Sequence, residues 1–370
     1  MNSDYVLKHP ESVSSPSLLF YRSLIQQNIL RAVAIAGSAD RLRPHVKTHK
    51  CREIARMWLA AGVTKHKCAT IAEAEMLAMC NAPDVLIAYP MVGPNCARVI
   101  ALSRKYSGTR FGVTIDHLKS LEMLASVSTD GPGIDAYLDI DCGMHRTGIA
   151  PGPEAIHLGK RISVAPRLRF AGLHVYDGHN HQEKEAERSV AVESLFGPVL
   201  DVRRQLEAQG IPVKRIVAGG TPTFAVHARQ TISGIECSPG TLSLHDYNYG
   251  NRYPELCITP AALLLTRVIS RPTADRITLD LGYKAVSPDQ PAGKRCVLLN
   301  VPDYEALLQN EEHFVVRSNR AADFLPGVVV YAMPAHVCPT VALHRRALIV
   351  DGGEVVDSWD IIARDREITT

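Results

Sequence analysis

The sequence predicts an α/β fold in which a (β/α)8 TIM barrel is followed by a C-terminal antiparallel β domain. Short β-rich runs alternate with helical segments over roughly the first 230 residues, which is typical of a barrel. After about Gly240 the helical periodicity fades, and short β-rich runs joined by Gly, Pro and Asp turns follow. The length of 370 residues also exceeds what one hydrophobic core usually supports, which favours two domains.

Eight β-rich runs are the predicted barrel strands. They are Ser17–Tyr21, Leu42–Lys47, Lys65–Ala69, Val85–Tyr89, Phe111–Ile115, Ala136–Asp141, Phe170–Tyr176 and Ile216–Ala218. Helical segments lie between them, the clearest at Arg52–Ala61, at Ala72–Cys80 and from about Glu183 to Gln209. In the last of these, apolar residues recur at helical spacing.

The predicted β domain has its own set of short strands. They are Leu263–Ile269, Arg276–Leu281, Arg295–Val301, His313–Val316, Val328–Met333 and Ala347–Val350. We expect residues 15–245 to form the barrel, and residues 246–370 together with residues 1–14 to form the β domain.

Composition excludes several classes of protein. Hydrophobic residues make up 46% and charged residues 21%, which excludes a disordered chain. The formal net charge of +3 is too small to indicate nucleic acid or an anionic membrane as partner, so a small molecule is expected. No apolar run approaches the roughly 18 residues of a membrane span. The polar start and the nine irregularly spaced cysteines favour a cytoplasmic protein with reduced thiols.

A basic cluster, Arg43 to Lys50, ends the second predicted strand. Barrel enzymes carry their reactive groups where strands end, and strand alternation puts His45 and Lys47 on one face. If that face lines the barrel, Lys47 projects into its mouth, where desolvation would make its amine a nucleophile for carbonyls. The alternative interpretation is a solvated basic loop.

Glycine and hydroxyl residues follow the last predicted barrel strand, at Gly219–Thr223 and again at Ser238–Thr241. Backbone N–H groups of such loops bind phosphate, although a tight turn that needs glycine explains the same residues. Together with a lysine at the barrel mouth, the loops indicate a phosphate-bearing aldehyde, pyridoxal 5'-phosphate (PLP).

Several motifs along the chain resemble the D-threonine aldolase / D-serine dehydratase family, a branch of the alanine-racemase-like PLP enzymes. They are Arg43–Lys50, Gly143–Gly148, Tyr176 with His179–His181, Gly219–Thr221, Pro239–Thr241 and Pro334–Thr340. The resemblance covers nearly the whole chain and implies an alanine-racemase-like barrel with a β domain.

The resemblance implies specific cofactor contacts. Lys47 is expected to form the internal aldimine, with Tyr176 near the pyridine ring and Arg146 near the phenolic oxygen. The expected phosphate contacts are Gly219, Gly220, Thr221, Gly240 and Thr241. Arg146 has a structural alternative, a pair with Asp139 or Asp141 on the preceding strand.

A divalent metal is implied at His336 and Cys338. On a strand, positions i and i+2 face the same way, so an imidazole and a thiolate could share one ion. Spacing alone does not choose this pair, because His49/Cys51 and His66/Cys68 have it too; the flanking prolines match the family. The donors favour Zn²⁺ over Mn²⁺.

A loop after Tyr176 carries His179 and His181. His181 matches the base that aldolase-type members place near the substrate hydroxyl, although loop histidines are often merely solvated. Asp246 and Tyr249 are further contact candidates.

The expected activity is PLP- and metal-dependent cleavage of β-hydroxy-D-amino acids. D-threonine aldolase, giving glycine and an aldehyde, is favoured by the histidine loop and by the general likeness. A D-serine or D-threo-3-hydroxyaspartate dehydratase is favoured by Cys338, because aldolases of the family carry Asp there. An amino-acid racemase and a non-catalytic cofactor carrier are further alternatives, and a homodimer is the family expectation.

Overall fold

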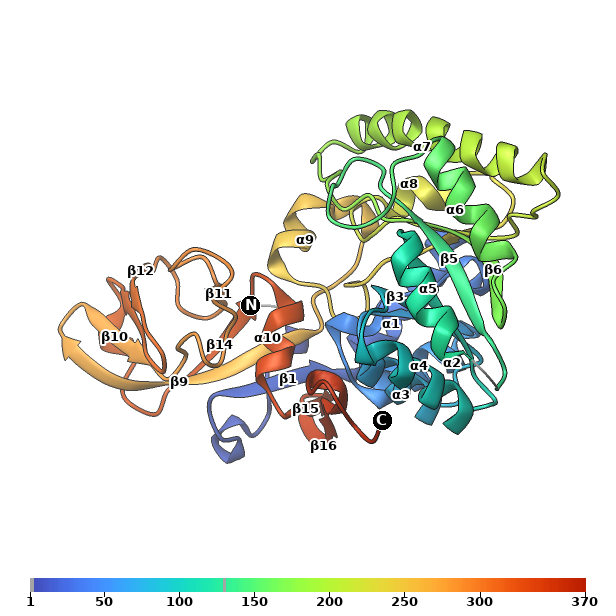
Figure 1. Ribbon diagram of the computed structural model, residues 1–370. Coiled ribbons are helices and arrows are strands. Elements are labelled where there is room, and N and C mark those ends of the chain that lie inside the picture. The colour runs from blue at the N-terminus through green and yellow to red at the C-terminus, as the bar shows by residue number, and fades with distance from the viewer. Residues whose placement is uncertain (1–2, 129–130) are drawn as a thin grey trace. The chain divides into compact units, whose positions relative to one another are not determined.

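The computed structural model describes residues 3–128 and 131–370, which form two compact units (Figure 1). The barrel unit contains residues 32–47, 55–240 and 365–370, and the β unit contains residues 1–31, 48–54 and 241–364. The predicted β-domain segment 1–14 includes Met1 and Asn2, which lie outside the described residues.

The barrel unit is built on a parallel sheet of seven strands in the order β2 to β8. The strands are β2 (Lys65–Cys68), β3 (Asp84–Pro90), β4 (Arg110–Ile115), β5 (Ile134–Ile140), β6 (Leu168–Val175), β7 (Ile216–Ala218) and β8 (Ile235–Cys237). Helices alternate with them: α3 (Ile71–Met79), α4 (Pro94–Lys105), α5 (Leu118–Val127), α6 (Pro153–Ser163), α7 (Glu185–Glu207) and α8 (Phe224–Arg229). Two more helices, α1 (Arg22–Ala36) and α2 (Arg52–Ala60), contain residues of both units.

A short segment, residues 42–45, joins the two edges of this sheet. Leu42 bridges to Cys237 of β8, and His45 bridges to Lys67 of β2, both in parallel. The N–H of Lys67 donates to the carbonyl of Pro44 at 2.9 Å. The predicted barrel is therefore confirmed.

Three strand assignments of the barrel were wrong in detail. Leu42–Lys47 is not a continuous strand, because Pro44 has no N–H to donate, and Val46–Thr48 forms a 3-10 turn. Ser17–Tyr21 is a strand (β1), but it belongs to the β unit. The strand Ile235–Cys237 was not predicted, because Glu236 at its centre interrupts the apolar run that marked the equally short Ile216–Ala218.

The β unit contains a mostly antiparallel sheet, in which β1 pairs in parallel with β15 and antiparallel with β9. Its strands are β1 (Ser17–Tyr21), β9 (Ala262–Thr273), β10 (Arg276–Leu279), β11 (Cys296–Leu298), β12 (Glu305–Gln309), β13 (Phe314–Arg317), β14 (Val329–Pro334), β15 (Arg346–Asp351) and β16 (Glu354–Asp360). The six strands predicted here are present, and β12 and β16 were missed.

Two short helices also belong to the β unit, α9 (Tyr247–Arg252) and α10 (Val337–Leu343). His336 is the N-cap residue of α10 and Cys338 lies in its first turn, so the predicted strand geometry for this pair was wrong. Pro339 is compatible with the first turn of a helix, where its missing N–H has no helical partner. Within the described ranges, no helix is both long and apolar enough to cross a lipid bilayer.

Ion pairs at buried positions hold the joining segment in the barrel. The fully buried Arg43 donates from Nε to Glu236 Oε2 and from Nη1 to Asp84 Oδ1, both at 2.6 Å. It thereby ties the segment to β8 and to β3. Breaking a buried pair by removing one partner is costly, because the other charge stays buried.

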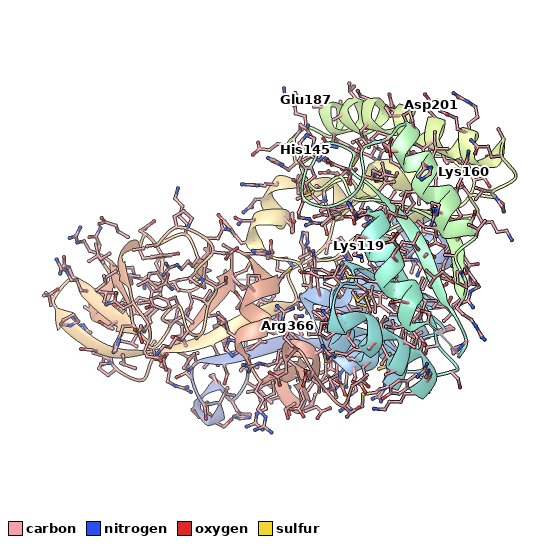
Figure 2. All side chains as sticks on the ribbon, viewed as in Figure 1. Lys119, His145, Lys160, Glu187, Asp201 and Arg366 are labelled. Atoms are coloured by element: carbon pink, nitrogen blue, oxygen red, sulfur yellow. The ribbon has the colours of Figure 1, made fainter. Side chains whose placement is uncertain are left out.

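We predict that Arg43→Met lowers the free energy of unfolding by about 3 kcal/mol, since Glu236 and Asp84 each lose an ion pair with a fully buried cation and keep only their pairs with Lys65 and Arg215. Urea denaturation measures the change. The matched control is Lys119→Met on α5, an exposed lysine (Figure 2) whose pair with Glu122 spans 3.8 Å. An effect on unfolding below about 1 kcal/mol is expected for the control, and a similarly small effect of Arg43→Met would contradict this view of the barrel.

Candidate active site

A cavity of about 530 Å³ opens at the carboxyl ends of the barrel strands. Its walls come from the joining segment, the ends of β2, β3 and β6, and the loop after β5. The lining residues are His45, Lys47, Lys67, Ala69, Ala88, Tyr89, Pro90, Val92, Arg146, Thr147, His174 and Tyr176. Lys47 lies in the 3-10 turn after the joining segment, and its N–H donates to Nδ1 of His45 at 3.2 Å.

Three cationic side chains surround the ring of Tyr176. From the ring centroid, the Arg146 guanidinium carbon lies at 4.5 Å, Lys67 Nζ at 5.6 Å and Lys47 Nζ at 5.9 Å. Among the described residues, none of the three has a carboxylate within ion-pair distance. The cavity therefore gathers three basic side chains, without acidic partners, against one aromatic face.

Arg146 does not form the ion pairs that were its structural alternative. Asp141 accepts from His145 at 2.8 Å and from two backbone N–H groups. Asp139 accepts from Nδ1 of His174 at 2.6 Å and from the hydroxyl of Thr147 at 3.1 Å. Both carboxylates are satisfied elsewhere, so the guanidinium stays over Tyr176.

His174 is a buried histidine with one nitrogen available toward the cavity. Its Nδ1 is held by Asp139, whereas its buried Nε2 has no hydrogen-bond partner in the described structure. Burial lowers the pKa of His174 despite the neighbouring carboxylate, which favours the neutral ring. In that state Nε2 is an acceptor that a bound ligand could satisfy.

Lys67 is the most deeply placed of the three cations. Its side chain points inward from β2 and only 2% of the residue is exposed. Burial, followed by the charge of Lys47, lowers the pKa of Lys67 to about 7. The cavity in the absence of a ligand thus disfavours the ammonium form.

The first predicted phosphate loop follows β7. Gly219 has φ +77°, and a Cβ there would lie 2.4 Å from the ring of His227. Its N–H donates to the carbonyl of Val175 at 2.9 Å, so the turn itself explains this glycine. The N–H of Gly220 contacts the hydroxyl of Thr223 at 3.3 Å, and that hydroxyl donates to Asp177.

The second predicted phosphate loop meets the first within the barrel unit. The N–H of Gly240 donates to the hydroxyl of Thr221 at 3.2 Å. The N–H of His45 also donates to the carbonyl of Pro239 at 2.8 Å, which links this loop to the segment carrying Lys47. Thr241 begins the next part of the β unit and is buried there.

The two loop histidines have different surroundings. His179 is half-buried, and its buried Nδ1 has no partner among the described residues. His181 is exposed. Neither contributes to the cavity lining, so the cavity does not by itself explain the base role predicted for His181.

The predicted metal pair lies in the β unit, at the start of α10. The side chains of His336 and Cys338 interact, and Nδ1 of His336 contacts a carboxylate oxygen of Asp289. Burial opposes the charged imidazole, but Cys338 and Asp289 outweigh it and raise the pKa of His336 to about 9. The hydroxyl of Thr48 lies 3.1 Å from Sγ of Cys338.

This donor set fits a zinc ion in part. Imidazole and thiolate are the ligands zinc prefers, and a carboxylate on the other imidazole nitrogen is the usual orienting partner. In residues 3–128 and 131–370, however, no group of three or more His, Cys, Asp or Glu side chains is arranged to hold a metal. A bound ion would need water or substrate at its remaining positions.

Asp246 and Tyr249 have structural contacts. The buried Asp246 caps α9 through the N–H of Tyr249 at 2.9 Å and accepts from the N–H of Val337 in α10 at 3.1 Å. Burial raises the pKa of Asp246 to about 6. Tyr249 stacks on His245 with 6.3 Å between ring centroids.

Sequence analysis missed four groups at these sites: Lys67, the Asp139–His174 pair, Thr48 and Asp289. Strand alternation could have found Lys67, because Lys65, Lys67 and Ala69 recur at every second position of a predicted strand. The other contacts join residues far apart in the chain and left no local signal.

The barrel residues fit PLP. The cofactor carries a phosphate and a phenolate, and the cavity offers three cations without carboxylate partners, an aromatic face and the unpartnered Nε2 of His174. At Gly220, a Cβ would approach the ring of Tyr176 to 3.1 Å, so a side chain would crowd this wall.

The chain is similar to known proteins over nearly its whole length. Residues 22–243 match the alanine racemase N-terminal domain family, and residues 261–350 match a serine dehydratase domain. A D-threonine aldolase from Arthrobacter sp. is 30% identical over 95% of this chain and 93% of its own length.

Solved structures have the same fold. The D-threonine aldolase from Filomicrobium marinum superposes with a TM-score of 0.88 at 27% identity, covering 96% of both chains. The D-threo-3-hydroxyaspartate dehydratase from Delftia sp. HT23 gives 0.84 at 22% identity, over 95% of this chain and 98% of that chain. A dehydratase of the latter name has also been solved as a cysteine-to-alanine variant in a metal-free form. The chain therefore belongs to the family that joins an alanine racemase N-terminal domain to a serine dehydratase domain, whose members are PLP-dependent lyases.

Proposed function

We propose that the protein is a D-threonine aldolase-type lyase that uses PLP and a divalent metal to cleave β-hydroxy-D-amino acids into glycine and an aldehyde. The observation that carries the proposal is the cavity in which Lys47 meets two further unpaired cations at Tyr176. The choice of an aldolase is supported by the 30% identity to a D-threonine aldolase. We also propose a homodimer, as the resemblance implies.

The barrel unit would hold the cofactor. Lys47 supplies the amine for the carbonyl, Arg146 a cation for the phenolate, and Tyr176 an aromatic surface. The loops at Gly219–Thr221 and Gly240, with Thr241, would hold the phosphate. Bound PLP would supply an electron-withdrawing ring for the electron pair of the broken substrate bond.

The β unit would hold the metal through His336 and Cys338. A divalent ion there would act as a Lewis acid on the β-hydroxyl oxygen. Asp289 fixes the orientation of the His336 ring through Nδ1, and the Thr48 hydroxyl can donate to the Cys338 thiolate. These two contacts keep both donors in place.

Proton transfer distinguishes the two candidate reactions. In the aldolase, His181 takes the proton of the β-hydroxyl, the Cα–Cβ bond breaks, and Cα is protonated to give glycine. In a dehydratase, Lys47 takes the α-proton and the hydroxyl leaves as water, giving a keto acid and ammonia after hydrolysis. Cys338 at the metal position favours this second candidate.

Lys47→Ala should abolish the visible absorbance band of lysine-linked PLP in the purified protein. The reason is that the proposal bonds the aldehyde to the amine of Lys47, whereas Lys67, the other amine of the cavity, projects from β2 and stays in place in this variant. The matched control is Lys160→Ala, an exposed lysine on α6 (Figure 2), which should keep the band at full intensity. An unchanged band in Lys47→Ala would contradict the assignment.

The double variant His336→Ala, Cys338→Ala should lose its bound zinc or manganese, because both predicted donors are gone. Elemental analysis of extensively dialysed protein gives the metal content per chain. Cys257→Ala, which removes an exposed cysteine of the same unit, should retain the wild-type content. Equal metal in the double variant and in this control would rule the site out.

Product analysis separates the two reactions. We expect D-threonine to yield glycine and acetaldehyde in equal amounts, with little keto acid or ammonia, and the L-isomer to be inert. Chromatography of the amino acids and an enzymatic ammonia assay measure both routes on one sample. Keto acid and ammonia from D-threonine or D-serine, without glycine, would establish the dehydratase instead.

A further inference from the structure

Lys67 differs from the other inward-facing cations of the barrel. Arg43 pairs with Glu236 and Asp84, and Lys65, two positions before Lys67 on β2, pairs with Glu236 at 2.9 Å. Nζ of Lys67 has no hydrogen bond or ion pair among the described residues, although only 2% of the residue is exposed. The same face of β2 thus carries one lysine that pairs with a carboxylate, Lys65, and one that does not, Lys67.

The two carboxylates that act on Lys67 electrostatically are held by other partners. Asp139 pairs with His174 at 2.6 Å and also accepts from Thr147. Asp177 pairs with His227 and accepts from Thr223, each at 2.8 Å. Neither can turn to Lys67 without leaving a buried histidine unpaired, which would cost the fold a hydrogen bond to a charged group.

Lys67 reaches the cavity near the carboxyl end of β2. Ala69, the residue just after this strand, also lines the cavity. The ammonium therefore faces the cavity beside Lys47 and Arg146 rather than a protein carboxylate. A buried cation without a counter-ion is unfavourable unless a ligand supplies one.

We propose that Lys67 is a ligand-binding residue that pairs with an anionic oxygen brought into the cavity by the cofactor or the substrate. The proposed chemistry brings a phosphate and a phenolate on PLP and a carboxylate on the substrate, and the last two lie near the carbon that reacts. The phenolate of PLP is adjacent on the ring to the carbonyl carbon that Lys47 attacks, and an amino acid joined at that carbon brings its carboxylate to the same region. The inference rests on the proposed function.

The experiment compares wild type with Lys67→Met, which keeps the length of the side chain and removes its charge. Lys65→Met is the matched control on the same strand, and circular dichroism checks that all three proteins are folded. In the first arm, apoprotein is titrated with PLP. In the second, KM for D-threonine or D-serine is measured with the cofactor saturating.

We expect Lys67→Met to weaken one of these affinities by about tenfold or more, as for loss of a hydrogen bond to a charged group. Weaker PLP binding identifies an anionic oxygen of the cofactor as the partner, and a raised KM with unchanged PLP affinity identifies the substrate carboxylate. Lys65→Met should change neither affinity by more than about threefold, because its partner is Glu236.

Proton uptake gives a readout that a packing defect would not produce. At pH 8 Lys67 is mostly neutral without a ligand, since its pKa is about 7. An anion that holds it charged makes binding take up about one more proton in wild type than in Lys67→Met. Calorimetry in two buffers of different ionisation enthalpy measures this difference.

The outcomes separate this inference from the proposed function. If wild type binds PLP and Lys67→Met matches it in both arms and in proton uptake, the inference is wrong and the proposed function stands. If wild type fails to bind PLP at all, both are wrong.

Discussion

A backbone pairing of four residues, 42–45, joins the last strand of the barrel to the first and positions Lys47. Leu42 bridges to β8 and His45 bridges to β2, while Arg43 between them is fixed by the carboxylates of Glu236 and Asp84. The turn that follows can therefore put Lys47 at the barrel mouth. The same segment contacts the loop that ends at Gly240 through Pro239, so the amine and one phosphate-loop candidate depend on one structural feature.

Charge compensation divides the interior of the barrel into two layers. At the level of Arg43 and Glu236, cations and carboxylates pair with one another and stabilise the fold. At the level of Tyr176, the carboxylates are used by histidines, and the lysines and arginine have no anion among the described residues. The first layer explains why the barrel closes, and the second explains why it would bind an anionic carbonyl compound. Perturbed and uncompensated ionisable groups in a cavity are typical of functional sites.

Much of the fold could be predicted from the sequence, because long periodic segments carry their own signal. Helix α7 was predicted within two residues of its bounds, and the family motifs led to Lys47 and Tyr176. The strand predictions that failed concerned features that tertiary contacts determine. Ser17–Tyr21 has the pattern of an ordinary strand whichever sheet it joins, and the short strand Ile235–Cys237 is interrupted by Glu236, whose partner Arg43 is distant in the sequence.

The candidate sites show the same division between local and distant information. The sequence shows the spacing of His336 and Cys338 directly. The prediction placed this pair on a strand, although Pro339 favours the first turn of a helix. Strand alternation could identify Lys67 as an inward-facing residue. The absence of an ion-pair partner for Lys67, however, depends on Asp139 and Asp177, which are more than seventy residues away in the sequence.

The central claim is that one lysine at the barrel mouth bonds to the aldehyde of PLP. Borohydride reduction of the protein loaded with PLP, followed by proteolysis and mass spectrometry, tests it directly. The account predicts a single reduced adduct, on the peptide that contains Lys47. An adduct on a different lysine, or no adduct at all, would contradict it.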